Sequence, residues 1–340
     1  MEIRHLFLVA MIVTMMIFSS VGVQSQGNDA PIQNIDDELP LVKFRDISNQ
    51  SGLGVNIENW EQDKTDVESF TPGVSWGDYD NDGWIDIFIT ANYDPSDLNS
   101  TAKPHLMHNN GDGTFTDVTL EAGITIEGFG LGLLIADLNN DGWPDIHVSN
   151  DYVTNDILYI NNQDGTFSNQ SSQKLKHQSQ FSMGSDIADF NNDLKPDLIT
   201  LDMLGEDNYR KKTTIGKNSY QVYISNEQWG YEYQHVRNML HLNNGEKAPF
   251  SEIGMYAGIY QTDWSWSPLF GDVDNDGQRD LLVTNGFPRD ITDKDFANYR
   301  ADVGSIATVR QLLDSIPIVK IPNYAFKNQS NFWVSILILF

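Results

Sequence analysis

The sequence predicts an all-β repeat protein, and two recurring motifs support this prediction. Short apolar stretches with strand periodicity are separated by turns rich in Gly, Asn and Asp, which is typical of β-strands joined by tight connections. An aspartate-rich loop occurs four times, with its first aspartate at positions 78, 137, 189 and 272. A second motif, of the type Asn-Asn-Gly-Asp-Gly-Thr-Phe, recurs in phase with the loop. Two motifs that recur together at this interval indicate repeated supersecondary units.

The first loop has the spacing of a calcium-binding loop, with Gly83 at position 6. Its positions 1, 3, 5 and 9 are all carboxylates, namely Asp78, Asp80, Asp82 and Asp86. Carboxylates this close repel one another unless a cation lies between them, and alternating oxygen ligands around a glycine turn suit Ca²⁺. An EF-hand would have Glu at position 12 and a following helix. Position 12 is Ile89, within an alternating apolar pattern, so the sequence predicts a calcium loop that leads into a β-strand.

The other three loops repeat the same positions with carboxylate or amide oxygens. The second loop supplies Asp137, Asn139, Asp141 and Asp145. The third supplies Asp189, Asn191, Asp193 and Asp197. The fourth supplies Asp272, Asp274, Asp276 and Asp280. We therefore expect three to four Ca²⁺ ions in a structural role. Solvated acidic turns without an ion are the alternative interpretation.

The third loop departs from the pattern because Leu194 replaces the glycine at position 6. A left-handed backbone conformation costs a non-glycine residue about 1–2 kcal/mol. We therefore expect the third site to be the weakest of the four.

Composition limits the function classes. The net charge of −27 disfavours nucleic-acid binding, because proteins that bind nucleic acids carry basic faces. A hydrophobic content of 40% and an aromatic content of 11% indicate a packed fold rather than disorder. The absence of cysteine excludes disulfides, thiol catalysis and cysteine-ligated zinc.

Residues 1–25 have the pattern of a secretory signal peptide: a short polar start, an apolar run and a small-residue cleavage site. A retained membrane anchor is the alternative, because the run is close to the length that spans a bilayer. Cleavage would leave no membrane span. Either interpretation predicts an extracellular, periplasmic or cell-surface protein. Residues 26–40 are polar and acidic and predict a linker.

Residues 41–290 contain the repeats, with an insertion at about residues 204–233 that carries a basic triplet, Arg210 to Lys212, and several aromatic residues. We expect a solvated loop with core aromatics there, with a glycan or anion site as the alternative. Residues 291–316 predict two helices, at 292–301 and 305–316, with Thr292 and Asp295 in a capping arrangement. Residues 317–340 are interpreted as the start of a further, truncated repeat, and a natural terminal strand is the alternative.

No catalytic constellation is predicted. Gly73 to Gly77 matches the Gly-x-Ser-x-Gly nucleophile pattern, but that motif requires a following helix, and here the pattern leads into an aspartate loop. The histidines lack the spacing of a metal site or a catalytic triad. His147 lies on a strand after a loop, where packing or exposure is expected. The tryptophans beside the loops are expected to pack between repeats.

These motifs resemble the FG-GAP/VCBS repeats that form the blades of integrin α-like β-propellers. The resemblance rests on residues 77–83, 130–145 and 110–115, and it covers about residues 41–290. Within this family the chain is most similar to the ASPIC/UnbV-associated, cartilage-acidic-protein-like group. The resemblance implies four-stranded antiparallel blades with a calcium loop between two strands of each. Four loops are fewer than the usual seven blades, so an incomplete β-propeller is expected.

Together, these features predict a secreted calcium-binding β-propeller that acts as a binding or adhesion module for a protein or polysaccharide partner. An extracellular enzyme that cleaves polysaccharides or phosphodiesters is the first alternative. A non-functional fragment of a longer cell-surface protein is the second.

Overall fold

The computed structural model describes residues 47–53, 73–90, 104–152, 154–214, 220–286, 289–304, 306–330 and 334–339. All of them belong to one unit, Ile47–Phe340. The predicted signal peptide and linker lie outside the described residues. None of the described helices has the length and hydrophobicity that crossing a bilayer requires.

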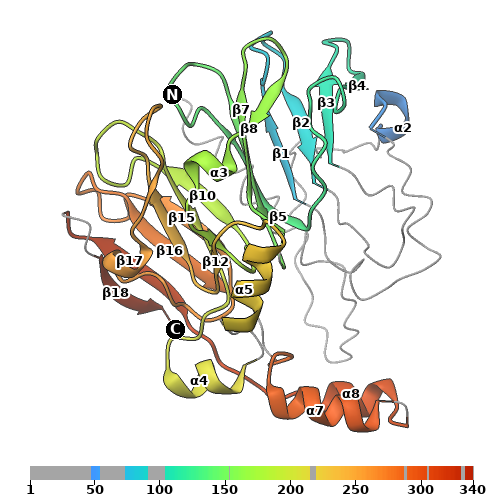
Figure 1. Cartoon of the computed structure of the whole chain (residues 1–340), viewed down its shortest axis with the longest axis vertical. Coiled ribbons are helices and arrows are strands. Elements are labelled where there is room, and N and C mark those ends of the chain that lie inside the picture. Colours follow the sequence, from blue (N-terminus) through green and yellow to red (C-terminus); the bar gives the residue numbers. More distant parts are fainter. Residues whose placement is uncertain are drawn as a thin grey trace, which may run out of the picture. The chain divides into compact units, whose positions relative to one another are not determined.

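Four antiparallel sheets of four strands each follow one another along the chain (Figure 1). The first sheet contains β1 (Val74–Gly77), β2 (Asp86–Ile89), β3 (His105–Asn109) and β4 (Phe115–Asp117). The second contains β5 (Gly130–Ala136), β6 (Asp145–Asn150), β7 (Ile157–Asn161) and β8 (Phe167–Asn169). The third contains β10 (Ser185–Ala188), β11 (Asp197–Thr200), β13 (Met239–Leu242) and β14 (Ser251–Glu252). The fourth contains β15 (Ser265–Gly271), β16 (Asp280–Asn285), β17 (Asn323–Asn328) and β18 (Val334–Leu339).

Each aspartate loop joins the first and second strands of its sheet. The residue before the loop pairs with the ninth loop residue in all four sheets: Gly77 with Asp86, Ala136 with Asp145, Ala188 with Asp197, and Gly271 with Asp280. The Asn-Gly type turns connect the third and fourth strands of the first two sheets. The predicted β-repeats are thus confirmed as antiparallel four-stranded units. None of the described sheets closes on itself.

Short helices lie before, between and after the strands. The helix α2 (Ser48–Ser51) precedes the first sheet, α3 (Ser171–Lys174) follows the outer strand of the second, and α6 (Gly254–Ala257) follows the outer strand of the third. Between its second and third strands the third sheet is interrupted by α4 (Asn208–Thr213), α5 (Tyr220–Gln228) and β12 (Gln234–His235), and β12 pairs in parallel with β9 (Gln178–Ser179), which precedes the sheet. The fourth is interrupted by α7 (Lys294–Val303) and α8 (Val309–Ser315).

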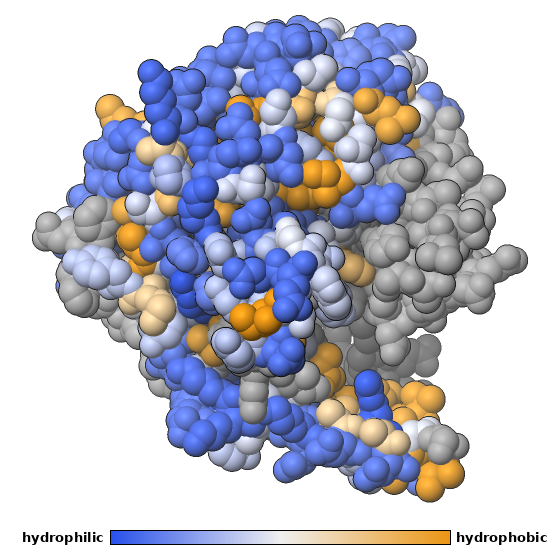
Figure 2. All heavy atoms as spheres, viewed as in Figure 1, coloured by the Kyte–Doolittle hydropathy of each residue, from blue (hydrophilic) through white to orange (hydrophobic). Residues whose placement is uncertain are grey.

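The fourth sheet shows where the sequence-based assignment was wrong. Residues 323–328 and 334–339 form β17 and β18, which pair next to β16 and so belong to the fourth sheet, not to a further repeat. The two predicted helices exist, but Asp293 caps α7 by accepting a hydrogen bond from the Phe296 N–H, whereas Thr292 is bonded to Asp290. The apolar residues Ile306, Val309 and Leu313 are exposed, and apolar residues gather over this segment in Figure 2.

The insertion in the third sheet also differs from its prediction. Tyr220 and Trp229 are exposed by 79% and 75%, so these aromatics are not core residues. Arg210 is paired with Asp263 and Asp290, which anchors α4 to the segments just before β15 and after β16 of the fourth sheet. Because Arg210 is paired with two carboxylates, its guanidinium is not free to bind an anion, as the alternative interpretation of the basic triplet would require.

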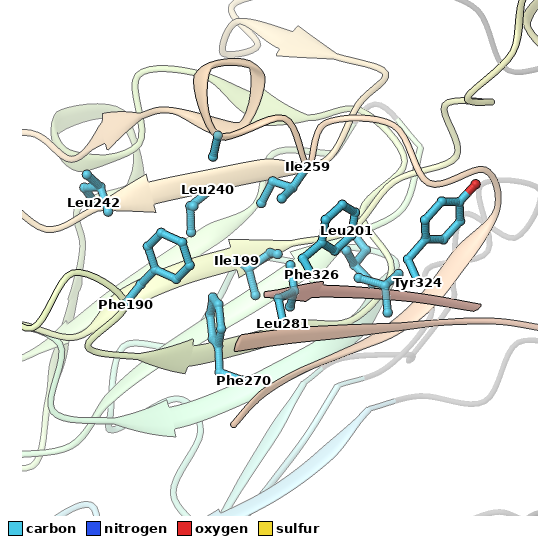
Figure 3. Packing of buried hydrophobic residues seen from close by; sticks show 12 residues of the cluster. Phe190, Ile199, Leu201, Leu240, Leu242, Ile259, Phe270, Leu281, Tyr324 and Phe326 are labelled. Carbon is cyan, nitrogen blue, oxygen red and sulfur yellow. The ribbon is translucent and has the colours of Figure 1, made fainter. Parts of the chain in front are cut away.

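Apolar residues fill the spaces between consecutive sheets. One cluster joins the first and second sheets through Phe88, Leu106 and Ile146. Another joins the second and third sheets through Leu158 and Leu198. The third cluster joins the last two sheets and is shown in Figure 3; its members include Phe190, Ile199, Leu240, Phe270, Leu281 and Phe326. Burying a large apolar side chain contributes about 1.5–3 kcal/mol, so these clusters supply much of the stability.

A buried asparagine also links each sheet to the preceding one. Asn161 Nδ2 donates to the Tyr79 carbonyl at 2.8 Å, Asn243 Nδ2 to the Leu138 carbonyl at 2.7 Å, and Asn328 Nδ2 to the Phe190 carbonyl at 2.9 Å. Each asparagine ends the third strand of its sheet, and each acceptor is the second residue of the preceding loop. We call these three contacts the asparagine bridges.

Replacement of Asn243 by Ala should lower the free energy of unfolding by about 1–3 kcal/mol, because it leaves the buried Leu138 carbonyl without its side-chain donor. Chemical denaturation with circular dichroism measures the change. Asn162→Ala, at an exposed turn position next to the bridging Asn161 of the second sheet, is the control and should change stability far less. Equal effects of the two variants would contradict a structural role for the bridge.

Candidate metal centres

The four aspartate loops share one backbone conformation. Position 4 is an asparagine with a positive φ in every loop: Asn81 (57°), Asn140 (60°), Asn192 (58°) and Asn275 (61°). Position 6 is also left-handed, at Gly83, Gly142, Leu194 and Gly277. Asparagine and glycine are the residues that adopt this conformation most readily. The repeated Asn-Asp-Gly sequence therefore encodes the turn directly.

The first aspartate of each loop organises the turn through both of its oxygens. In the first loop, Asp78 Oδ1 accepts the Asp82 N–H at 3.0 Å, and Oδ2 accepts the Gly83 N–H at 2.9 Å. The same two bonds recur at Asp137, Asp189 and Asp272. The aspartate at position 5 in turn accepts the N–H of position 7, as Asp82 does from Trp84 at 2.8 Å. These bonds hold the side-chain oxygens on the inner side of the turn.

The oxygens converge closely enough to share a cation. In the first loop, oxygen atoms of Asp78, Asp80 and Asp82 lie within 4.8 Å of one another. The fourth loop brings Asp272, Asp274 and Asp276 together in the same way. In the second and third loops position 3 is an asparagine, Asn139 or Asn191, whose amide oxygen accepts the N–H of position 5 at 2.9 and 3.1 Å. A set of hard oxygen donors fits Ca²⁺.

The aspartate at position 9 is buried and connects the loop to the third strand. Asp86 Oδ2 accepts the Tyr79 N–H at 3.1 Å, and its Oδ1 accepts the Asn109 N–H at 2.8 Å. Asp145, Asp197 and Asp280 make the equivalent pairs of bonds. Burial raises the pKa of Asp86 and Asp197 to about 6 and that of Asp145 to about 7. A cation bound nearby would favour the ionised form of these carboxyls.

Some loops already contain a basic side chain, which the sequence motif does not indicate. In the third loop, Lys195 Nζ lies 2.8 Å from Asp193 Oδ2. In the fourth loop, Lys327, which comes from β17, pairs with Asp276 at 3.1 Å and with Asp274. His108 Nδ1 lies 3.3 Å from Asp80 in the first loop. These groups compete with an ion for the same oxygens, so the four loops are not equivalent.

Neighbouring loops are also bonded to one another through position 4. Asn81 Nδ2 donates to the Gly142 carbonyl at 3.1 Å, Asn140 Nδ2 to the Leu194 carbonyl at 2.9 Å, and Asn192 Nδ2 to the Gly277 carbonyl at 3.2 Å. We call these contacts the loop bridges. They place the four candidate centres in one continuous row.

The Gly-x-Ser-x-Gly pattern does not have the strand–turn–helix setting of a nucleophile motif. Residues 74–77 of the Gly-x-Ser-x-Gly pattern form β1, which continues into the first loop and then into β2. His147 is fully buried, and burial lowers its pKa to about 3, which keeps the ring neutral. Its location fits the packed role expected from the sequence.

A cavity lies at the strand ends away from the loops, and no sequence motif indicates it. Its volume is about 350 Å³, and its lining includes Glu127, Thr154, Asn155, Asn169 and Tyr231. Asn155 Oδ1 accepts the Glu232 N–H at 3.0 Å and a bond from Gln234 Nε2 at 3.1 Å, which fixes the end of the insertion beside the cavity. The lining comes from four separate places in the sequence, at residues 126–128, 154–157, 169 and 231, so pattern analysis could not predict it.

Buried carboxylates gather near the same strand ends. Burial raises the pKa of Asp151 and Asp156 to about 7 and that of Asp202 to about 6, and the charge of Asp202 adds to the effect on the other two. Asp156 nevertheless accepts the Asn150 N–H at 2.8 Å. These groups belong to the connections after β6 and β11 and before β7.

Leu194→Gly should stabilise the third loop, because Leu194 has a φ of +68° and its side chain is 84% exposed. Relief of about 1–2 kcal/mol of backbone strain is partly offset by the larger chain entropy of glycine, about 0.5–1 kcal/mol. The reciprocal Gly142→Leu in the second loop should destabilise the protein, because Gly142 has a φ of +87°. An added Cβ there meets no atom within 4 Å, so the effect comes from backbone strain and not from a clash. Thermal unfolding with calcium measures both; a destabilising Leu194→Gly would contradict the strain argument.

Asp193→Asn should reduce calcium stoichiometry and melting temperature less than Asp82→Asn does, because the third site is strained and Lys195 already neutralises Asp193. Isothermal titration calorimetry with Ca²⁺ and thermal unfolding compare the two variants. A larger loss from Asp193→Asn would reverse the predicted ranking of the sites.

Asp156→Asn should reduce the dependence of stability on pH. The folded-state pKa of Asp156 is about 7, well above the ordinary aspartate value near 3.9, so the folded state binds this proton more tightly than the unfolded state. The contribution of Asp156 to the free energy of unfolding therefore falls as pH rises from about 4 to about 7. With chelator present, the melting temperature of the variant should fall less between about pH 5 and pH 8. Parallel curves for both proteins would contradict this assignment.

Comparison with known proteins identifies the repeats. Residues 78–148 and 137–200 each match the family model described as an FG-GAP-like repeat, and each match begins at the first aspartate of a loop. A comparison with curated proteins gives no significant match.

Two solved structures show a weak likeness. A lectin from Agrocybe aegerita that recognises non-reducing terminal N-acetylglucosamine is 14% identical, with a TM-score of 0.32 over 81% of this chain and 67% of the lectin. The V. cholerae biofilm matrix protein Bap1 is 16% identical, with a TM-score of 0.30 over 64% of this chain and 35% of Bap1. TM-scores of this size establish neither a common fold nor a common ligand. The two matched segments nevertheless show that this chain contains FG-GAP-like repeats.

Proposed function

We propose that the chain is a secreted, calcium-stabilised β-propeller module that binds a protein or polysaccharide partner in adhesion. The observation that carries the proposal is the row of four aspartate loops with one backbone conformation, each with oxygens turned inward by backbone N–H groups. The FG-GAP-like repeats support the same interpretation.

The arrangement of the sheets supports the interpretation that each sheet is one blade of an incomplete propeller. The first strands of consecutive sheets are neighbours: β1 lies beside β5, β5 beside β10, and β10 beside β15. Each sheet packs face to face on the next through an apolar cluster. In a propeller the inner strands surround a central axis in the same way.

Calcium would be held by positions 1, 3, 5 and 9 of each loop, where it would neutralise the carboxylates that now repel one another. The pKa of Asp80 is raised by burial and by the charge of Asp82, which is the repulsion an ion would remove. Loop bridges connect adjacent centres, so an ion in one loop also supports the next sheet. The net charge of −27 makes this neutralisation important for the whole chain.

The partner surface is proposed at the strand ends away from the loops. The cavity there offers amide, hydroxyl and carboxylate groups beside the ring of Tyr231, a combination that suits sugar hydroxyls or a peptide side chain. Tyr220 and Trp229 are exposed on the same insertion. Exposed aromatic residues are enriched where proteins bind partners.

Thermal unfolding with millimolar calcium and with chelator tests the structural part of the proposal. We expect calcium to raise the melting temperature, with three to four ions bound per chain by calorimetric titration. The linkage relation predicts about 2.7 kcal/mol of stabilisation for a site at one hundred times its dissociation constant. A stable fold that is indifferent to calcium would overturn the calcium assignment.

Binding to an immobilised panel of polysaccharides, measured in calcium, tests the recognition part. Tyr231→Ala should weaken any binding several-fold without changing the melting temperature by more than a few degrees. Leu120→Ala, which is exposed by 71% in the turn after β4, is the control that should bind normally. Equal binding by both variants would exclude the cavity as the recognition site.

A further inference from the structure

Two contacts recur wherever one sheet meets the next, namely the asparagine bridge and the loop bridge. At the junction of the first two sheets there is also a close approach, in which the residue before the first loop lies against the second sheet. A Cβ built on Gly77 would meet the Ile135 side chain at 2.5 Å. We call the face of a sheet that packs on the next sheet its forward face, and the opposite face its rear face.

The forward face of the fourth sheet lacks its half of every contact. The second loop residue is 5%, 2% and 2% exposed at Tyr79, Leu138 and Phe190, but 60% exposed at Val273. A Cβ built on Gly271, the counterpart of Gly77, would meet no atom within 4 Å. Among the described residues, Asn275 makes no loop bridge, although Asn81, Asn140 and Asn192 all do.

The rear face of the first sheet lacks the complementary half. Asn109 Nδ2 donates to the Ile85 carbonyl of its own sheet at 3.0 Å, and within the described structure it makes no asparagine bridge. Trp76 pairs with Ile87 as Ile135 pairs with Ile146, so Trp76 is the counterpart of the side chain that covers Gly77. Trp76 is 61% exposed.

The two open faces are therefore complementary, and we propose that they bind each other in a head-to-tail dimer of this chain. In the dimer, Asn109 of one copy donates to the Val273 carbonyl of the other, and Asn275 donates to the Gly83 carbonyl. Trp76 of one copy covers Gly271 of the other. These are the contacts that already hold consecutive sheets together, transferred to the junction between two molecules.

A second copy is the occupant because each copy carries both complementary faces, with Asn109 and Trp76 on one and Val273, Gly271 and Asn275 on the other. The four aspartate loops and the four strand-ending asparagines, Asn109, Asn161, Asn243 and Asn328, all have places in the described sheets. Residues 1–46, 54–72 and 91–103 contain no loop of this spacing. A head-to-tail contact that closes after two copies forms a twofold ring. The ring would contain eight sheets, which is within the range of four to eight blades known for propellers.

The molar mass in solution, measured by light scattering during gel filtration in calcium, tests the proposal. We expect twice the monomer mass at high micromolar concentration. Trp76→Arg or Gly271→Arg should each give monomers with an unchanged circular dichroism spectrum, because both positions are open in the single chain. Trp229→Arg, at a comparably exposed tryptophan away from both faces, should remain dimeric. A monomeric wild-type protein would overturn the proposal.

Engineered cysteines test the pairing itself, since the chain has no cysteine of its own. Trp76→Cys and Gly271→Cys should each stay uncrosslinked alone under mild oxidation, whereas a mixture of the two variants should give a covalent dimer. Crosslinking of Trp76→Cys with itself would show a face-to-face dimer instead and would contradict the head-to-tail arrangement. A mixture that stays uncrosslinked, although it is dimeric by mass, would also contradict it.

Discussion

The buried aspartate at the ninth loop position is the interaction on which the rest of the structure depends. Its two oxygens accept one N–H from the start of the loop and one from the end of the third strand, as Asp145 does from Leu138 and Asn161. The same bond fixes the backbone of Asn161, whose side chain then reaches the Tyr79 carbonyl of the preceding sheet. One carboxylate thus couples loop shape, strand pairing and sheet stacking.

This coupling explains why the acidic loops are tolerated without large local cost. Much of the loop charge is stabilised by backbone N–H groups, which act as fixed partial positive charges. Basic side chains contribute where they are available, as Lys327 does in the fourth loop. The carboxylates that remain at positions 3 and 5 are the ones an ion would neutralise. Binding of an ion there would therefore be linked to the stacking of the sheets through shared residues.

Sequence patterns predicted the loops and strands because those features are local. The strain at Leu194 follows from its position alone, and its φ of +68° agrees with that expectation. The two residues of each asparagine bridge are separated by between 82 and 138 positions in the sequence, so no local signal reveals these bridges. Residues 317–340 were misassigned because α7 and α8 separate β16 from β17. The cavity and the pairing of Lys327 with the fourth loop likewise depend on tertiary contacts.

A chain of sheets that are each bonded only to their neighbours has the thermodynamics of a one-dimensional array. In the single chain, the second and third sheets are supported on both faces, whereas the first and fourth are supported on one. Opening should therefore begin at the termini of the array and spread inward, with amide protons protected longest on β6, β7, β11 and β13. The local stability of each sheet is then set less by its own sequence than by its distance from an uncovered face.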